Sequence, residues 1–192
     1  MSKHLTTIQA FVLTLCLAWT TSAARAAELD GITMPDHMVV DGTPLILNGM
    51  ALRTASLLRV RVYVVGLYLQ QPGHDTERIV GSSQVKLLHF VFLHDVSAAK
   101  ARASWRNSLA RNCPAPCRLR PDEVAQFLAS IPAMRAGYTA DVLFVPRRVD
   151  FIVNGRSLGQ VTDPIFARVI LLCYIGPQAK PAAVRNGVLG LR

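Results

Sequence analysis

The sequence lacks the short motifs that identify the commonest classes of enzyme. It contains no glycine-rich loop of the kind that holds phosphates, no G-x-S-x-G nucleophile motif and no H-E-x-x-H zinc motif. The histidines of the later sequence (His37, His74, His89 and His94) do not have the spacing of metal ligands, and no Ser/His/Asp or Cys/His group can be assembled. We therefore expect no metal and no cofactor.

Long apolar segments are also lacking after the N-terminus. The apolar stretch at residues 165–175 is 11 residues long and contains Arg168, whereas a helix that spans a bilayer needs about 20 residues. We therefore predict a buried helix at this position and no membrane span in the mature protein.

The first 26 residues have the three parts of a secretory signal peptide. A short basic start is followed by an apolar run at residues 11–19 and by Ala24-Arg25-Ala26, which has the A-x-A cleavage pattern. We expect cleavage after Ala26, which removes residues 1–26. Residues 27–192 then form one domain, exported across the inner membrane and located in the periplasm.

Positive charge exceeds negative charge but is not concentrated. The sequence has 21 Lys and Arg against 12 Asp and Glu, a formal net charge of +9, without a run of five or six like charges. A basic chain can bind nucleic acid, anionic membrane surfaces or acidic ligands. Because an exported protein has little access to nucleic acid, we expect no nucleic-acid partner and interpret most of the charge as a soluble basic surface.

Three cysteines remain after the expected cleavage. Cys113 and Cys117 enclose Pro-Ala-Pro and could form a local disulfide in an oxidising compartment. Two thiols without nearby His or Cys partners do not make a zinc site, so a disulfide is favoured over a metal. Cys173 lies in the apolar stretch and is predicted to be a packed thiol.

The order of the predicted strands and helices favours an α+β fold. Strands come in runs, with one helical block in the middle of the chain and another at the C-terminus, so we expect a mainly antiparallel sheet covered on one face by helices. Asn154-Gly155 between two short strands is a strong hairpin signal. The predicted strands are residues 38–40, 44–47, 57–70, 84–93, 138–146, 151–153 and 157–161, and the predicted helices are residues 75–80, 97–112, 120–130, 163–174 and 181–189.

The stretch RVRVYVVGLYL at residues 59–69 alternates as a β-strand does. In a regular strand Arg59, Arg61 and Tyr63 stand at i, i+2 and i+4, so we predict that they share one face of the sheet. Arg53 lies a few residues upstream. The pattern leaves open whether this face is wet or holds a negatively charged group against apolar walls.

Arg53 and Tyr63 are the first candidate pair for ligand binding. Arg carries a permanent charge and a planar set of donors that matches a carboxylate, and Tyr adds an O–H donor. In an apolar cleft they would hold the anionic end of a long hydrophobic molecule, or polarise a carbonyl during a reaction. Alternatively, Arg53 ends a turn in water and Tyr63 packs against the helices.

Trp105 and Asn112 are the second candidate pair. They lie seven residues apart on one predicted helix, about 20° from the same bearing on its surface. Trp105 could form the wall of a pocket, and Asn112 could orient a polar ligand atom. A core Trp and an Asn that ends the helix before Cys113 would explain the same residues.

Four segments together resemble the chalcone isomerase-like family. LNGMALRTASLLRVRVYVVGLYL contains the family's Leu-x-Gly-x-x-x-Arg turn and a strand that ends in Gly-x-Tyr-Leu. LLHFVFLHDVSAAKARASWRNSL is similar to the family's strand and Trp-containing helix, and VPRRVDFIVNGRSLGQV and FARVILLCYIGPQAKPAAVRNGVLG are similar to its closing hairpin and helices. The resemblance implies a large antiparallel sheet with helices layered on one side and a cleft between them, in an exported bacterial branch of the family.

The resemblance also implies roles for the candidate residues. Arg53 occupies the place of the Arg that anchors the substrate in plant chalcone isomerases. Those enzymes carry a Thr near the position of Tyr63, whereas the related plastid fatty-acid-binding proteins pair the Arg with a Tyr to hold a carboxylate. Asn112 is similar to an Asn that contacts substrate in the plant enzymes, and Trp105 replaces their active-site Tyr.

These correspondences lead to three alternatives for the function. The favoured one is a non-catalytic periplasmic protein in which Arg53 and Tyr63 bind a fatty acid or a similar amphipathic carboxylate, while Arg59 and Arg61 are solvent charges. The second is an intramolecular lyase of the chalcone isomerase type that acts on an aromatic enone; the loss of two hydroxyl groups, at Tyr63 and Trp105, counts against it. The third is a ligand-free structural or interaction protein.

Overall fold

A seven-stranded antiparallel sheet forms the centre of the computed structural model, which describes residues 26–55 and 58–191. The predicted signal peptide therefore lies outside the described residues, except for Ala26, where the first strand begins. The strands lie side by side in the order in which they follow one another in the sequence, β3-β4-β5-β6-β7-β8-β9. They are β3 (His37–Val40), β4 (Thr43–Ala55), β5 (Val60–Leu69), β6 (Lys86–Phe92), β7 (Thr139–Val145), β8 (Arg148–Val153) and β9 (Arg156–Val161).

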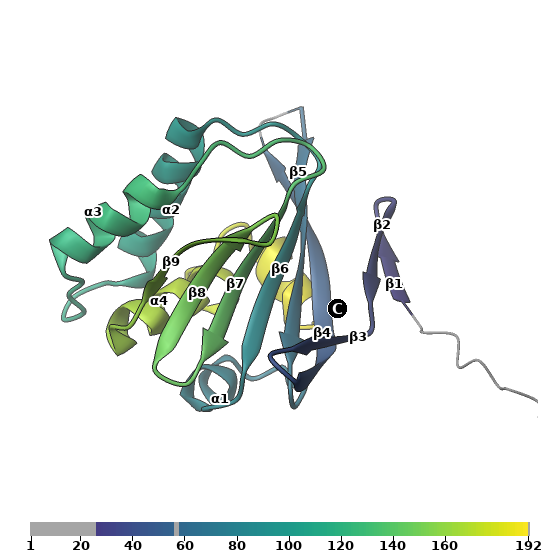
Figure 1. Cartoon of the computed structure of the whole chain (residues 1–192), viewed down its shortest axis with the longest axis horizontal. Coiled ribbons are helices and arrows are strands. Elements are labelled where there is room, and N and C mark those ends of the chain that lie inside the picture. Colours follow the sequence, from purple (N-terminus) through teal and green to yellow (C-terminus); the bar gives the residue numbers. More distant parts are fainter. Residues whose placement is uncertain (1–25, 56–57, 192) are drawn as a thin grey trace, which may run out of the picture.

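Helices cover one face of this sheet, which curls around them (Figure 1). They are α1 (Thr76–Gly81), α2 (Ala98–Asn112), α3 (Pro121–Ser130), α4 (Pro164–Ile175) and α5 (Ala182–Val188). Asp75, Ser97 and Asp163 begin three of them, because each side chain accepts a hydrogen bond from a backbone N–H of the first turn. The predicted α+β fold, an antiparallel sheet with helices layered on one face, is confirmed.

The main core lies between the inner face of the sheet and the helices. Val65, Leu67 and Leu88 of the central strands are fully buried in one cluster with Phe166 and Ile170 of α4. The apolar stretch at residues 165–175 is thus the buried helix that the sequence predicts. No helix within residues 26–55 and 58–191 combines the length and the apolar character that crossing a membrane requires.

Helix α5 contacts strand β4 at two glycines. A Cβ atom on Gly49 would lie 2.2 Å from the carbonyl oxygen of Gly187, and a Cβ on Gly187 would lie 2.7 Å from the Cβ of Ala51. Only residues without a side chain permit this approach. This contact fixes α5 against β4, and Arg53 follows Ala51 by two residues in that strand.

Strand β4 is longer than predicted, because a β-bulge absorbs Asn48. The sequence predicts a strand at residues 44–47 and the next strand only from residue 57. The register shifts between Leu47 and Gly49 instead, and the strand continues. The Asn48 side chain donates to the Val188 carbonyl oxygen at 2.9 Å and accepts from the Gly73 N–H at 2.7 Å. It therefore links the bulge to the end of α5 and to the loop after β5.

The N-terminal hairpin of β1 (Ala26–Leu29) and β2 (Ile32–Pro35) was not predicted from the sequence. It lies on the side of the sheet opposite the helices (Figure 1). Met34 is 1% exposed and packs over Gly66, while the Tyr68 hydroxyl donates to the Pro35 carbonyl oxygen at 3.0 Å. These short strands carry too few apolar residues for a clear sequence pattern. Their position is set by packing against the sheet.

The prediction that Arg59, Arg61 and Tyr63 share one face is wrong. Arg53 pairs with Tyr63, but the next residue of β4 pairs with Arg61, so Val62 is an extra residue in β5. The bulge reverses the alternation, and the Arg61 side chain points to the outer face.

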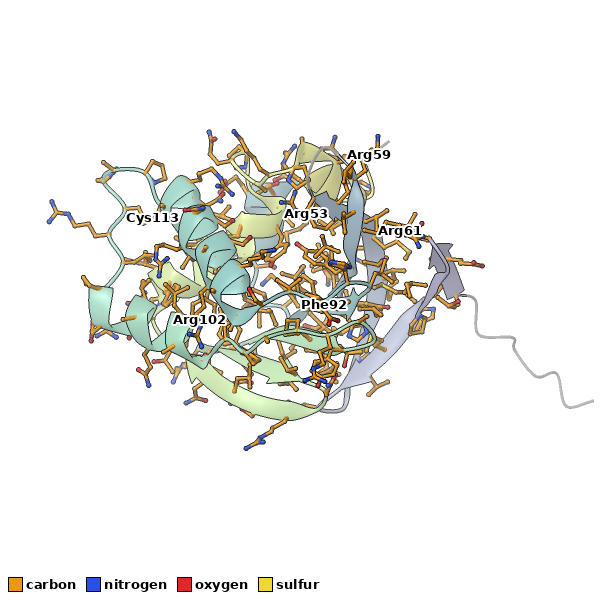
Figure 2. The ribbon with its side chains drawn as sticks, turned by 90° about the horizontal axis from the view of Figure 1, so that it is seen from above. Arg53, Arg59, Arg61, Phe92, Arg102 and Cys113 are labelled. Atoms are coloured by element: carbon orange, nitrogen blue, oxygen red, sulfur yellow. A yellow bond between two sulfur atoms is a disulfide. The ribbon has the colours of Figure 1, made fainter. Side chains whose placement is uncertain are left out.

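Arg59 and Arg61 both lie away from the inner face of the sheet. Arg61 Nη1 is 2.9 Å from Asp30 Oδ1 of the N-terminal hairpin, and 60% of the Arg61 side chain is exposed. Arg59 is exposed and has a positive φ of 51° just before β5 begins. Figure 2 shows both at the edge of the molecule, whereas Arg53 points inward.

Candidate functional site: a cavity between sheet and helices

A cavity of about 600 Å³ lies between the inner face of the sheet and the helices. Its size is within the range of small-molecule pockets, roughly 300–1,000 Å³. Strands β4 to β9 form one wall, and α2, α3, α4 and α5 form the other. Most of the lining is apolar or aromatic, and residues such as Phe90, Trp105, Phe127 and Phe151 provide surface for a hydrocarbon chain.

Arg53 reaches this cavity from strand β4. It is half-buried and lies directly opposite Tyr63 in the register of β4 and β5, so both side chains are on the inner face. No salt bridge among residues 26–55 and 58–191 involves Arg53. Its guanidinium group is therefore available to a ligand that brings a negative charge.

Tyr63 is held in place by aromatic neighbours on β6. Its ring packs edge-on against Phe90, with centroids 5.3 Å apart, and is tilted against Phe92 at 5.5 Å. Burial raises the pKa of Tyr63 to about 12, although the charge of Arg53 and the Tyr174 side chain oppose this shift. The phenol is therefore neutral at physiological pH and keeps its O–H as a donor beside Arg53.

Tyr174 brings a second phenol to the same place from helix α4. Its ring centroid is 5.3 Å from that of Phe90 and 5.8 Å from that of Trp105, so it links the sheet to α2. Burial raises the pKa of Tyr174 well above its ordinary value, and Tyr63 adds to the shift. Sequence reasoning missed this residue, although a Tyr within an otherwise apolar helix is a signal that a polar atom needs a partner.

Of the second candidate pair, the structure brings only Trp105 to the cavity. The Trp105 ring forms part of the wall and packs edge-on against Phe127 at 5.1 Å. Asn112 is not among the lining residues. It is buried at the end of α2, where its Nδ2 donates to the Ser108 carbonyl oxygen at 2.9 Å and its Oδ1 lies close to Gly176.

The cysteines lie on two sides of α2. Cys113 and Cys117 are joined by a disulfide just after the helix, outside the cavity. Cys173 is a buried free thiol that lines the cavity, and burial raises its pKa to about 11. It is therefore a thiol and not a thiolate at neutral pH.

The charged residues of the lining are mainly basic. Arg111, Lys100 and Lys180 line the cavity in addition to Arg53. The two acidic residues of the lining are Asp95, which accepts from the Ala136 N–H, and Asp141, which pairs with His89. Among the described residues, no three His, Cys, Asp or Glu side chains come together as metal ligands would. The cavity thus combines cations and the neutral O–H groups of Tyr63 and Tyr174 with a mainly apolar lining.

Comparisons with known proteins agree with this architecture. The model of the family described as chalcone isomerase-like matches residues 26–190. No curated protein matches the chain in sequence. The crystal structure of a fatty-acid binding protein of Arabidopsis thaliana is similar, with a TM-score of 0.68 and 17% sequence identity, over 86% of this chain and 96% of that one. At this identity the likeness establishes the fold.

Proposed function

Since the chain belongs to the chalcone isomerase-like family, we propose that its cavity binds a fatty acid or a similar amphipathic carboxylate without chemical turnover. The observation that carries the proposal is the pairing of Arg53 with Tyr63 inside an apolar cavity. The guanidinium group supplies charge and two parallel donors for a carboxylate. The neutral phenol supplies a further donor, and aromatic side chains surround the tail.

The chemistry of the lining favours binding over isomerisation. Closing a ring on an enone requires aligned donors that stabilise an enolate oxygen. Trp105, at the wall of the cavity, contributes no hydroxyl group, and the phenols of Tyr63 and Tyr174 are held neutral by burial, which disfavours proton abstraction by either. The name of the Arabidopsis relative, a fatty-acid binding protein, is consistent with a binding role.

We further propose that the protein acts in the periplasm after removal of residues 1–26. The support is the signal-peptide pattern that ends at Ala26 and the Cys113–Cys117 disulfide, which suits an oxidising compartment. Cell fractionation followed by N-terminal sequencing of the periplasmic protein tests this. A protein that begins at Met1 in the cytoplasm would contradict it.

The function is tested by native mass spectrometry of the mature protein, followed by denaturation and identification of the released lipid. We expect a co-purifying fatty acid in the wild type and none in Arg53→Gln. Arg59→Gln is the matched control, because it removes the same charge from an exposed turn of the same sheet. Equal loss in both variants would reduce the effect to general charge attraction, and turnover of a chalcone that depends on Arg53 would establish the isomerase instead.

A further inference from the structure

Arg111 is a second arginine that lines the cavity, and the proposed function does not require it. Arg111 lies in the last turn of α2, on the same side of that helix as Ser104, Trp105 and Ser108, all of which line the cavity. Their spacing of three or four residues puts them on one helix face. Arg111 thus reaches the cavity from the helix wall, whereas Arg53 reaches it from the sheet.

Part of the Arg111 guanidinium group is buried without a partner. Its Nε atom is buried, and the residues that the structure describes provide no hydrogen-bond acceptor for it. A positive side chain near the end of a helix is favourable for the helix dipole, but that does not explain a buried donor left unsatisfied. A buried donor without an acceptor is unfavourable, and more so when it is charged, so an acceptor supplied by a ligand is the simpler explanation.

No acidic residue of the lining is free to supply that acceptor. Asp95 Oδ1 accepts from the Ala136 N–H at 2.8 Å, and Asp141 Oδ1 pairs with His89 Nδ1 at 2.6 Å. None of the salt bridges within residues 26–55 and 58–191 includes Arg53 or Arg111. Within the part of the chain that the structure describes, neither of these two carboxylates forms a salt bridge with Arg53 or Arg111, so both guanidinium groups can accept an anion from a ligand.

The two arginines approach the same end of α4 from opposite walls. Burial raises the pKa of the Cys173 thiol, and the nearby charge of Arg111 opposes that shift. The next residue, Tyr174, is within the electrostatic reach of Arg53 in the same way. Tyr174 itself packs against Phe90 of the sheet and Trp105 of α2, with ring centroids 5.3 and 5.8 Å apart, so both walls meet α4 here, and both arginines line this same cavity.

We propose that Arg111 is a second anion-binding residue of the cavity and that the polar end of the ligand carries two negative charges. This inference rests on the proposed function and specifies its ligand class. A long-chain alkyl phosphate and an alkyl dicarboxylate share this chemistry. In either case Arg53 and Tyr63 bind one negatively charged oxygen of the ligand, and Arg111 binds the other.

The test compares three ligands of similar chain length on the delipidated mature protein by isothermal titration calorimetry at pH 8. They are dodecanoate, dodecyl phosphate and dodecylsuccinate. We expect one of the dianions to bind at least about tenfold more tightly than dodecanoate, because only a dianion forms a second charge-assisted hydrogen bond, with Arg111. The dianion that binds more tightly identifies the source of the second charge.

Variants test whether Arg111 causes the preference for a dianionic ligand. Arg111→Gln is expected to abolish the preference for the dianion while leaving dodecanoate binding within about threefold, and Arg111→Lys is expected to restore part of it. Arg106→Gln removes a charge from the same helix outside the cavity and should change neither affinity. Arg53→Gln should weaken all three ligands.

Two results would overturn the inference. One is equal affinity of the wild type for all three ligands; if dodecanoate binding then still depends on Arg53, the proposed function stands and only the role of Arg111 fails. The other is an equal loss of all three ligands in Arg111→Gln with an unchanged melting temperature, which would make Arg111 a general contact. If the wild type binds none of the ligands, the proposed function fails together with the inference.

Discussion

Arg53 and Tyr63 lie directly opposite each other on neighbouring antiparallel strands, at the last pair before a β-bulge. The bulge at Val62 turns Arg61 to the outer face and leaves Arg53 as the arginine of this strand pair that faces the cavity. Pairing across an antiparallel ladder places two side chains on the same face at short distance. The backbone itself therefore brings the two donors together before any ligand binds.

Tyr63→Phe is expected to weaken fatty-acid binding without unfolding the protein. The variant keeps the ring that packs against Phe90 and Phe92 and removes only the hydroxyl group. The loss of one hydrogen bond of about 0.5–1.5 kcal/mol corresponds to roughly 2- to 13-fold in the dissociation constant. Calorimetry measures it, with Tyr138→Phe, outside the cavity lining, as the control. Unchanged affinity would show that the phenol does not contact the carboxylate.

Stability is expected to fall as the pH rises from 10 toward 12. Burial raises the pKa of Tyr63 and of Tyr68 to about 12, from an ordinary value of 10.0. Within this window the unfolded chain has released protons that the folded protein still holds, so the free energy of unfolding decreases with pH. Urea unfolding at several pH values measures the slope, which Tyr63→Phe should reduce. An absorbance titration with tyrosine pKa values near 10 would contradict the prediction.

The titration of Lys86 should increase the free energy of unfolding as the pH rises, and it should do so at lower pH than the tyrosines decrease it. Its Nζ donates to the carbonyl oxygens of Ser82 and Gln84 at 2.7 and 3.1 Å, and the residue is 5% exposed. Burial lowers its pKa from 10.5 to about 8. Between these values the unfolded chain binds a proton that the folded protein has lost, so the contribution of Lys86 to stability rises with pH.

The effect of Lys86 is separable from that of the tyrosines. Below pH 8 the ammonium group is charged in both states and the full penalty of burying it is present, so no change with pH is expected there from this residue. Lys86→Met should lose the rise between pH 8 and 10 and retain the fall above pH 10. Parallel pH profiles of the wild type and this variant would mean that the pKa of Lys86 is not lowered.

The fold was largely predictable because most of its elements carry a local signal. Residues 97–112 and 163–174 each begin with a residue that N-caps a helix, and the helices begin and end within one residue of these ranges. The bulge at Val62 has no such signal, since the alternation of residues 59–69 reads without interruption. Its position depends on the pairing of β5 with β4, which is a property of the tertiary structure.

The candidate site was predictable only in part, for a related reason. The family resemblance points to Arg53, Tyr63, Trp105 and Asn112, and the structure brings the first three of them to one cavity. Tyr174 lies within an apolar run that reads as core, and Arg111 reads as a charged residue at a helix end. Both gain a role only because α2 and α4 lie across the cavity from the sheet, and no single segment of sequence contains that information.

Gly187→Ala tests whether the position of Arg53 depends on the contact between α5 and β4. The new Cβ would lie 2.7 Å from the Met50 carbonyl oxygen, so the helix or the strand must move. We expect a loss of stability of about 1–3 kcal/mol and weaker fatty-acid binding, because β4 carries Arg53. Gly73→Ala is the control, since a Cβ there meets no atom within 4 Å. A variant with lower stability but full affinity would separate the site from this contact, whereas an unchanged melting temperature would contradict the close packing itself.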